Sequence, residues 1–152
     1  FKGVNTILKP VIEELIKEGY PIEMYFADKQ ERMIPHHLMV DYYSKIDIYV
    51  CVSENEGTPN PVLESMACGV PIISTDVGIV PEAFGTKQKE FIMEERTKEC
   101  LKSKLLLILE NPKILKDLSQ ENLIQIKNWT WDIKTNDFDN YFQKCLGGEK
   151  ND

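Results

Sequence analysis

Short apolar segments alternate with amphipathic ones along this chain, and this alternation constrains the fold more than any other feature of the sequence. The segments 46–53, 70–75 and 90–93 are apolar, short and bounded by polar residues, which predicts strands. Residues 21–28 alternate apolar and polar side chains and predict another strand. Strands that are apolar along their whole length are typical of parallel sheets covered by helices on both faces. We therefore predict an open, doubly wound α/β fold with a parallel sheet.

Helical periodicity fills the segments before and between the strands. Residues 5–19 predict an amphipathic helix that ends at Gly19, with Pro10 near its first turn if Asn5 or Thr6 caps it. The residues predicted to share its apolar face are Ile7, Leu8, Val11, Ile12, Leu15 and Ile16. A short helix is predicted within residues 36–45.

C-terminal helices are predicted by apolar residues three and four apart in segments 101–109 and 114–126, and by residues 129–146. In the last of these segments, Trp129 and Trp131 are expected to anchor the helix on the core. The chain therefore ends in helices packed around the predicted sheet.

A chain of 152 residues suits one domain, which we assign to residues 1–145, with a flexible tail at 146–152. A net charge of -7 and a pI near 4.9 argue against binding to nucleic acid. No apolar run approaches the roughly 20 residues of a membrane span, so no transmembrane segment is predicted in this piece. The four cysteines lack C-x-x-C spacing, which predicts a reduced, cytoplasmic chain without a metal site.

The segment "SENEGTPNP" follows the strand predicted at 46–53, and ligands of such sheets bind outside the carboxyl ends of the strands. Asn60 can cap a helix that starts at Pro61 and stops at Gly69. Glu64 then lies one turn into this helix, and Glu56 lies in the loop before it.

The two carboxylates are therefore predicted to face one crevice, with the helix N-terminus between them. Free N–H groups and the helix dipole favour an anion there, and carboxylates accept hydrogen bonds from hydroxyl groups. A phosphate centre with a polyol at each end describes a nucleoside diphosphate sugar. The alternative is a purely structural role, in which Glu64 is a favourable charge in a first helical turn and Glu56 is a solvated loop residue.

A wider pattern surrounds these glutamates. It comprises "KG" at Lys2 and Gly3, "YYSKIDIYVCVS" at 42–53, then E-G-x-x-x-P-V-L-E, "SMACGVPIISTDVG" and "NWTWD" near 129. In this order the motifs resemble the donor-binding half of family-4 glycosyltransferases of the GT-B fold, over nearly the whole chain. The resemblance implies the Rossmann-like C-terminal half of such an enzyme, whose first strand would precede Phe1.

Residue roles follow from this resemblance. It implies that Glu56 is a catalytic residue contacting hydroxyls of the donor sugar, and that Glu64 binds the ribose. Lys2 would pair with the diphosphate, and backbone N–H groups near Thr58 and Asn60 would hold phosphate oxygens. The donor-binding residues implied are Lys2, Glu56, Gly57, Thr58, Asn60 and Glu64.

The resemblance also implies an activity for the longer protein: transfer of a sugar from a UDP- or GDP-linked donor with retention of configuration. The acceptor would be held by an N-terminal domain, so residues 1–152 alone are expected to be inactive. No cofactor and no metal are expected, and cell-envelope polysaccharide synthesis is the implied setting. The expected location is cytoplasmic, with peripheral attachment to the inner face of the membrane left open.

The sequence departs from the family pattern at Thr58 and Pro59, where most members have an aromatic residue and a glycine. Pro59 has no N–H to donate, so the amides that would meet phosphate are open to question. A non-catalytic GT-B-like module, used for binding or for contact with a partner, is the alternative that this departure favours. A flavodoxin-like domain is disfavoured, because its phosphate loop would follow the first strand.

Overall fold

The computed structural model describes residues 2–26 and 34–146, and its centre is a three-stranded parallel sheet in the order β1-β2-β3. These strands are β1 (Tyr49–Cys51), β2 (Ile72–Thr75) and β3 (Ile92–Met93). They lie within the predicted strand segments, and the connections between them contain helices. The predicted α/β fold with a parallel sheet is confirmed.

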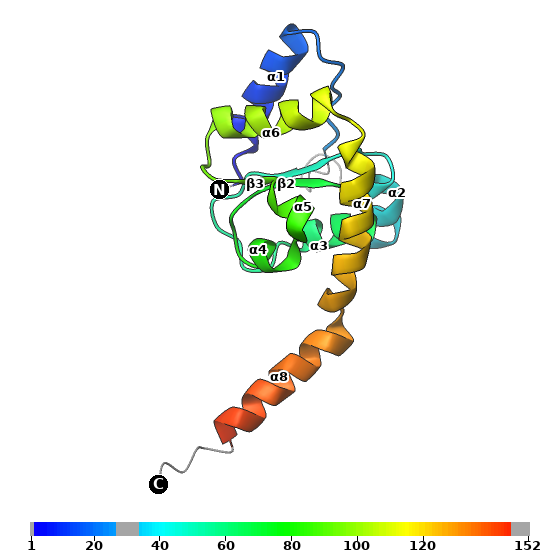
Figure 1. The fold of residues 1–152 in the computed structure, drawn as a ribbon, viewed down its shortest axis with the longest axis vertical. Helices are drawn as coiled ribbons and strands as arrows, with labels where there is room; N and C mark the ends of the chain where they lie inside the picture. Colours follow the sequence, from blue (N-terminus) through cyan, green and yellow to red (C-terminus); the bar gives the residue numbers. More distant parts are fainter. Residues whose placement is uncertain (1, 27–33, 147–152) are drawn as a thin grey trace.

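The helices follow in the order expected of such a fold. In chain order they are η1 (Val4–Leu8), α1 (Lys9–Lys17), η2 (His36–Leu38), α2 (Met39–Tyr43), α3 (Asn60–Ala67), α4 (Val80–Ala83), α5 (Thr86–Lys89), α6 (Lys98–Glu110), α7 (Ile114–Gln125), η3 (Ile126–Trp129) and α8 (Trp131–Leu146). Figure 1 shows α1 and α6 on one side of the sheet and α3 and α4 on the other. Both faces of the sheet are therefore covered.

Strand β2 is the central strand of the sheet, and all four of its residues are buried. Its neighbouring side chains point to opposite faces, as a strand requires. Ile73 packs in the apolar cluster that includes residues of α1 and α6, whereas Ile72 packs in the cluster formed with α3 and α4. In register, Ile72 lies opposite Tyr49 of β1, and Ser74 lies opposite Ile92 of β3.

The N-terminal helix forms as predicted but with a different start and a narrower apolar face. It opens with the π-helical turn η1 after Gly3, so the cap predicted at Asn5 or Thr6 is wrong. Pro10 lies in the first turn of α1, where its missing N–H matters least. Ile16 is 45% exposed, so it does not share the buried face with Val11 and the other core residues.

The strand predicted at 21–28 is wrong for its described part, because residues 21–26 join no strand ladder. The alternation matches burial only in part, since Ile22 and Met24 pack against the core whereas Phe26, the next apolar residue in the same pattern, is exposed. Alternation reports which side chains are buried, whereas a strand also needs a neighbour to share its backbone hydrogen bonds. Residues 27 and 28 lie outside the described part of the chain.

A buried glutamine completes the hydrogen bonding of β2 where β3 does not reach. The side chain of Gln88 accepts from the N–H of Ile72 at 3.2 Å and donates to its carbonyl at 2.6 Å. Asn122 of α7 donates to the same Gln88 oxygen at 2.8 Å and to the carbonyl of Val70 at 3.0 Å. Gln88 and Asn122 are fully buried, so these bonds have no competition from water. An amide side chain thus replaces a strand residue.

We expect Gln88→Ala to lower the free energy of unfolding by about 2–4 kcal/mol, since it leaves buried groups of Ile72 and Asn122 without partners. Urea denaturation followed by circular dichroism measures the change. The matched control is Lys89→Ala in the same helix, where an exposed side chain should change stability by less than about 0.5 kcal/mol. Equal effects of the two substitutions would contradict this role of Gln88.

Helix α8 is predicted correctly, but its anchoring is not. None of its residues is buried, and Trp131 is 80% exposed. Figure 1 shows α8 extending away from the rest of the domain. Trp129, which precedes α8, does pack against the cluster of α3 and α4, and the ammonium of Lys134 lies 4.3 Å from its ring centroid. Within the described residues, no helix combines the length and apolar character needed to cross a membrane.

Candidate functional site

The carboxyl ends of the three strands meet at one edge, and this edge carries a hollow of about 170 Å³. It is lined by residues at the ends of the strands or just after them: Ser53, Glu54, Thr75, Asp76, Val77, Met93, Glu94 and Arg96. The hydroxyl of Thr75 donates to the carbonyl of Ser53 at 2.7 Å, which ties the end of β2 to the loop after β1. The loop with Glu56 begins at this edge, where the sequence placed it.

Helix α3 begins one residue earlier than predicted. Asn60 is its first residue, Pro59 is the capping residue, and no side chain caps the helix. The carbonyl of Pro59 accepts from the N–H of Val62 at 2.8 Å, so the capping role predicted for Asn60 is wrong. Because Pro61 already occupies the first turn, fewer N–H groups need a side-chain acceptor. The helix ends at Ala67, and Gly69, which has a φ of 70°, turns the chain just beyond it.

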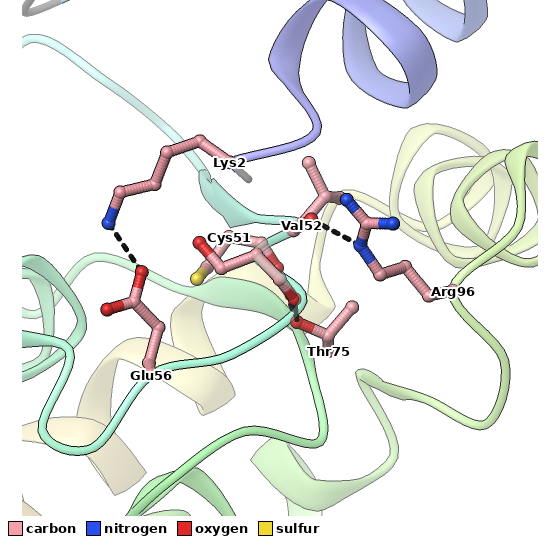
Figure 2. Close-up of polar contacts among 7 residues, drawn as sticks. Lys2, Cys51, Val52, Glu56, Thr75 and Arg96 are labelled. Atoms are coloured by element: carbon pink, nitrogen blue, oxygen red, sulfur yellow. Dashed lines mark hydrogen bonds and ion pairs between the residues drawn. The ribbon is translucent and has the colours of Figure 1, made fainter.

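Lys2 and Glu56 form an ion pair, so two of the predicted donor-binding residues lie side by side (Figure 2). The side chain of Lys2 is 74% exposed, whereas that of Glu56 is only 18% exposed. The hydrogen bond from Lys2, followed by one from Ser53, holds the pKa of Glu56 below its ordinary value. The carboxylate is therefore ionised at neutral pH and faces a largely exposed cation.

We expect Lys2→Met to raise the pKa of Glu56 toward its ordinary value of 4.5, because the main stabilising partner of the carboxylate is removed. Carboxyl ¹³C chemical shifts followed against pH measure it. A depressed pKa in the folded state adds stability above the ordinary value, and this stability is lost as pH falls through the folded value. The variant should therefore lose less stability on acidification than the wild type.

The control for this measurement is Lys113→Met, which removes an exposed lysine ahead of α7. It should leave the titration of Glu56 unchanged. An unaltered Glu56 titration in Lys2→Met would show that the ion pair does not form in solution.

Glu64 has a partner that the sequence did not predict. The hydroxyl of Tyr43, at the end of α2, donates to Oε2 of Glu64 at 2.8 Å. Tyr43 is 1% exposed, and burial, followed by the bond to Glu64, raises the pKa of its hydroxyl above the ordinary value. The "YY" motif ahead of β1 belongs to the pattern noted in the sequence, but nothing in one sequence pairs position 43 with position 64.

A third tyrosine, Tyr49, has a pKa that both glutamates help to raise. Burial raises the pKa of Tyr49 most, with smaller contributions from Cys51, Tyr42, Glu56 and Glu64 in that order. Tyr49 is the first residue of β1 and packs against the cluster of α3 and α4. Both carboxylates thus raise the pKa of one partly buried phenol, although their own hydrogen-bond partners differ.

The loop with Glu56 is held against the turn after β2. The carbonyl of Gly57 accepts from the N–H of Ile79 at 3.1 Å. Gly78 has a φ of 51°, and a Cβ there would lie 1.8 Å from the carbonyl oxygen of Gly57. Only glycine permits this approach, since a side chain would meet backbone. Gly57, Thr58 and Asn60 are exposed beside this contact.

We expect Gly78→Ala to destabilise the fold by about 2 kcal/mol or more, because the new methyl group has to push the two backbone segments apart. Thermal and urea unfolding measure the loss. The matched control is Gly57→Ala, whose Cβ would meet nothing within 4 Å. It should change stability by less than about 1 kcal/mol. Similar stabilities for the two variants would contradict the close contact.

Arg96 is a further residue of this edge that the sequence did not single out. Its Nε donates to the carbonyl of Val52 at 2.9 Å, and a Cβ on Gly3 would lie 2.8 Å from its Nη2. Figure 2 shows Lys2 and Glu56 on one side of the end of β1, with Arg96 and Thr75 on the other. Gly3, with a φ of 69°, lets the chain pass between these groups.

A second hollow, of about 210 Å³, lies beside α2. Its lining includes Tyr25, Ile34, Pro35, Leu38, Asp41, Tyr42 and Lys45.

Across residues 2–26 and 34–146, no three histidine, cysteine, aspartate or glutamate side chains gather in a way that could hold a metal ion.

The described geometry defines an α/β domain whose candidate ligand site lies at the carboxyl edge of a parallel sheet. The family described as "Glycosyl transferases group 1" matches residues 31–124. The chain therefore belongs to this family, and its fold is that of a GT-B glycosyltransferase domain. The predicted resemblance is confirmed.

Two curated relatives illustrate the match. Over 68 residues, 45% of the chain, it is 37% identical to a Bacillus subtilis protein named as a putative teichuronic acid biosynthesis glycosyltransferase. Over 128 residues, 84% of the chain, it is 24% identical to the Escherichia coli O-antigen chain mannosyltransferase B. The matched parts span 17% and 31% of those proteins.

Solved structures share the fold. A sucrose-phosphate synthase from Thermosynechococcus elongatus superposes with a TM-score of 0.61 at 22% identity, over 93% of this chain and 35% of that one. The C-terminal domain of a glycosyl transferase group 1 family protein from Francisella tularensis superposes with a TM-score of 0.53 at 24% identity, over 80% and 61% respectively.

Proposed function

We propose that this chain is the donor-binding domain of a glycosyltransferase that uses a nucleoside diphosphate sugar. The observation that carries the proposal is the separate fixation of two carboxylates around the start of α3. Glu56 is paired with Lys2, and Glu64 is bound by Tyr43. Two fixed acceptors with helix N–H groups between them suit a ligand with hydroxyls at both ends and phosphate in the middle.

Each end of the ligand then has its own protein group. Glu64 accepts hydrogen bonds from the ribose hydroxyls, and Glu56 accepts them from hydroxyls of the donor sugar. The first N–H groups of α3 and the ammonium of Lys2 face the diphosphate. The buried Pro59 offers no N–H, so the amides of Gly57, Thr58 and Asn60 are the proposed phosphate contacts in this loop.

Lys2 has to change partners when the diphosphate arrives. Its side chain is mostly exposed, so the ion pair with Glu56 is screened by water and easily rearranged. On binding, its ammonium would move to the diphosphate and leave Glu56 for the sugar hydroxyls. The charge that builds up on the departing diphosphate would then be stabilised by Lys2 and by the start of α3.

The proposal extends to the reaction of the longer protein. It transfers a sugar from a UDP- or GDP-linked donor, with retention of configuration and without a metal ion, to an acceptor held by a second, N-terminal domain. The names of the relatives, teichuronic acid biosynthesis and O-antigen chain synthesis, support cell-envelope polysaccharide as the product class. Such synthesis starts from cytoplasmic donors, which supports a cytoplasmic location. Residues 1–152 alone should bind donor without transferring sugar.

The test is a calorimetric titration of the chain with UDP, GDP, UDP-glucose, UDP-N-acetylglucosamine and GDP-mannose. We expect one nucleotide class to bind, and Glu64→Ala to weaken that binding by about tenfold or more, because the ribose loses a charged acceptor. The control variant, Glu13→Ala, removes an exposed carboxylate of α1 and should leave affinity unchanged.

The alternative function makes a different prediction in the same titration. A non-catalytic module would bind none of these nucleotides at millimolar concentration, while wild type and both variants remain folded. That result would overturn the donor-binding proposal.

A further inference from the structure

We propose that Tyr43 is a positioning residue, which fixes Glu64 so that its free oxygen meets the ribose of the donor. This inference rests on the proposed function and adds a specificity-determining residue to it. The hydrogen bond that carries it joins residues 21 positions apart, from the end of α2 to the second turn of α3.

The phenol of Tyr43 is itself held rigidly. Its ring makes edge contacts with Tyr42, at a centroid distance of 5.3 Å, and with Tyr49, at 6.4 Å. Tyr42 in turn stacks on Tyr25 at 5.2 Å, and its hydroxyl donates to the carbonyl of Tyr25 at 3.1 Å. With 1% of Tyr43 exposed, the hydroxyl has little freedom to leave the carboxylate.

Glu64 by itself would not be so ordered. It is half-buried on α3, and a glutamate side chain has several rotamers of similar energy. The bond to Tyr43 occupies Oε2 and leaves Oε1 to accept from a ligand. Because burial and the bond to Glu64 raise the pKa of Tyr43, the phenol remains a donor over the physiological range. The carboxylate is thus arranged before the ligand arrives, which favours affinity.

The hydrogen bond of Tyr43 can be tested separately from the packing of its ring. A phenylalanine at position 43 would make the same ring contacts with Tyr42 and Tyr49. Only the hydroxyl reaches Oε2 of Glu64, so its removal separates positioning from packing. Tyr42 provides the matched comparison in the same ring cluster, since its hydroxyl donates to a backbone carbonyl instead.

The experiment compares binding of UDP and GDP with binding of their 2′-deoxy counterparts by the chain of residues 1–152. Wild type should favour the ribonucleotide of the class it binds. We expect Tyr43→Phe to narrow this preference by about three- to tenfold, whereas Tyr42→Phe retains it. In a double-mutant cycle, Tyr43→Phe should add little once Glu64→Ala is present, because the acceptor of the Tyr43 hydroxyl is then gone.

The outcomes separate the inference from the proposed function. A wild-type preference for ribose that Tyr43→Phe leaves intact overturns the positioning role and keeps the donor site. A wild type that binds a nucleotide but ignores the 2′-hydroxyl overturns the ribose role of Glu64, and the positioning role of Tyr43 with it, and keeps the donor site. A wild type that binds no nucleotide overturns the proposed donor site itself.

A second measurement covers a Tyr43→Phe variant that fails to fold. The hydroxyl proton of Tyr43 in wild type, which burial protects from exchange, should shift in its ¹H NMR spectrum when UDP or GDP is added. An unchanged resonance at saturating nucleotide would overturn the inference.

Discussion

The pairing of β2 with its neighbours is the interaction on which the rest of this domain depends. Its side chains fill both apolar clusters, so the strand cannot be displaced without exposing the core on both faces. At its first residue, Gln88 satisfies the backbone groups of Ile72 on the side that β3 does not reach. At its last residue, Thr75 bonds the loop after β1. One strand therefore links the core to the edge that carries the candidate site.

The side chains of the candidate site are held in place by elements that are far apart in the sequence. The loop with Glu56 is held by the turn at Gly78, and Glu64 is held by the tyrosine cluster of α2 and β1. These supports approach α3 from different sides, and they restrain the two carboxylates independently. Such an arrangement can hold both ends of an extended ligand without making either carboxylate depend on the other.

Much of this fold follows from local patterns. The three paired strands and the main helices were predicted because burial and periodicity are local properties of a sequence. The errors arise where distant partners decide: residues 21–26 alternate but lack a paired neighbour, and Trp131 follows an aromatic pattern but meets no core. The site shows the same limit. Motif order singled out Glu56, Glu64 and Lys2 as candidates, whereas Tyr43 and Arg96 depend on contacts across 21 and 44 positions.

The ion pair between Lys2 and Glu56 gives this acidic domain a particular way to receive an anion. With a net charge of -7, the surface as a whole repels phosphate, and a lone buried carboxylate at the site would add to that repulsion. The lysine acts as a counter-ion that neutralises Glu56. In the proposed binding step the ammonium would leave Glu56, whose new partners would be neutral hydroxyl groups, and pair with the diphosphate. The same cation would thus serve the carboxylate before binding and the ligand after it.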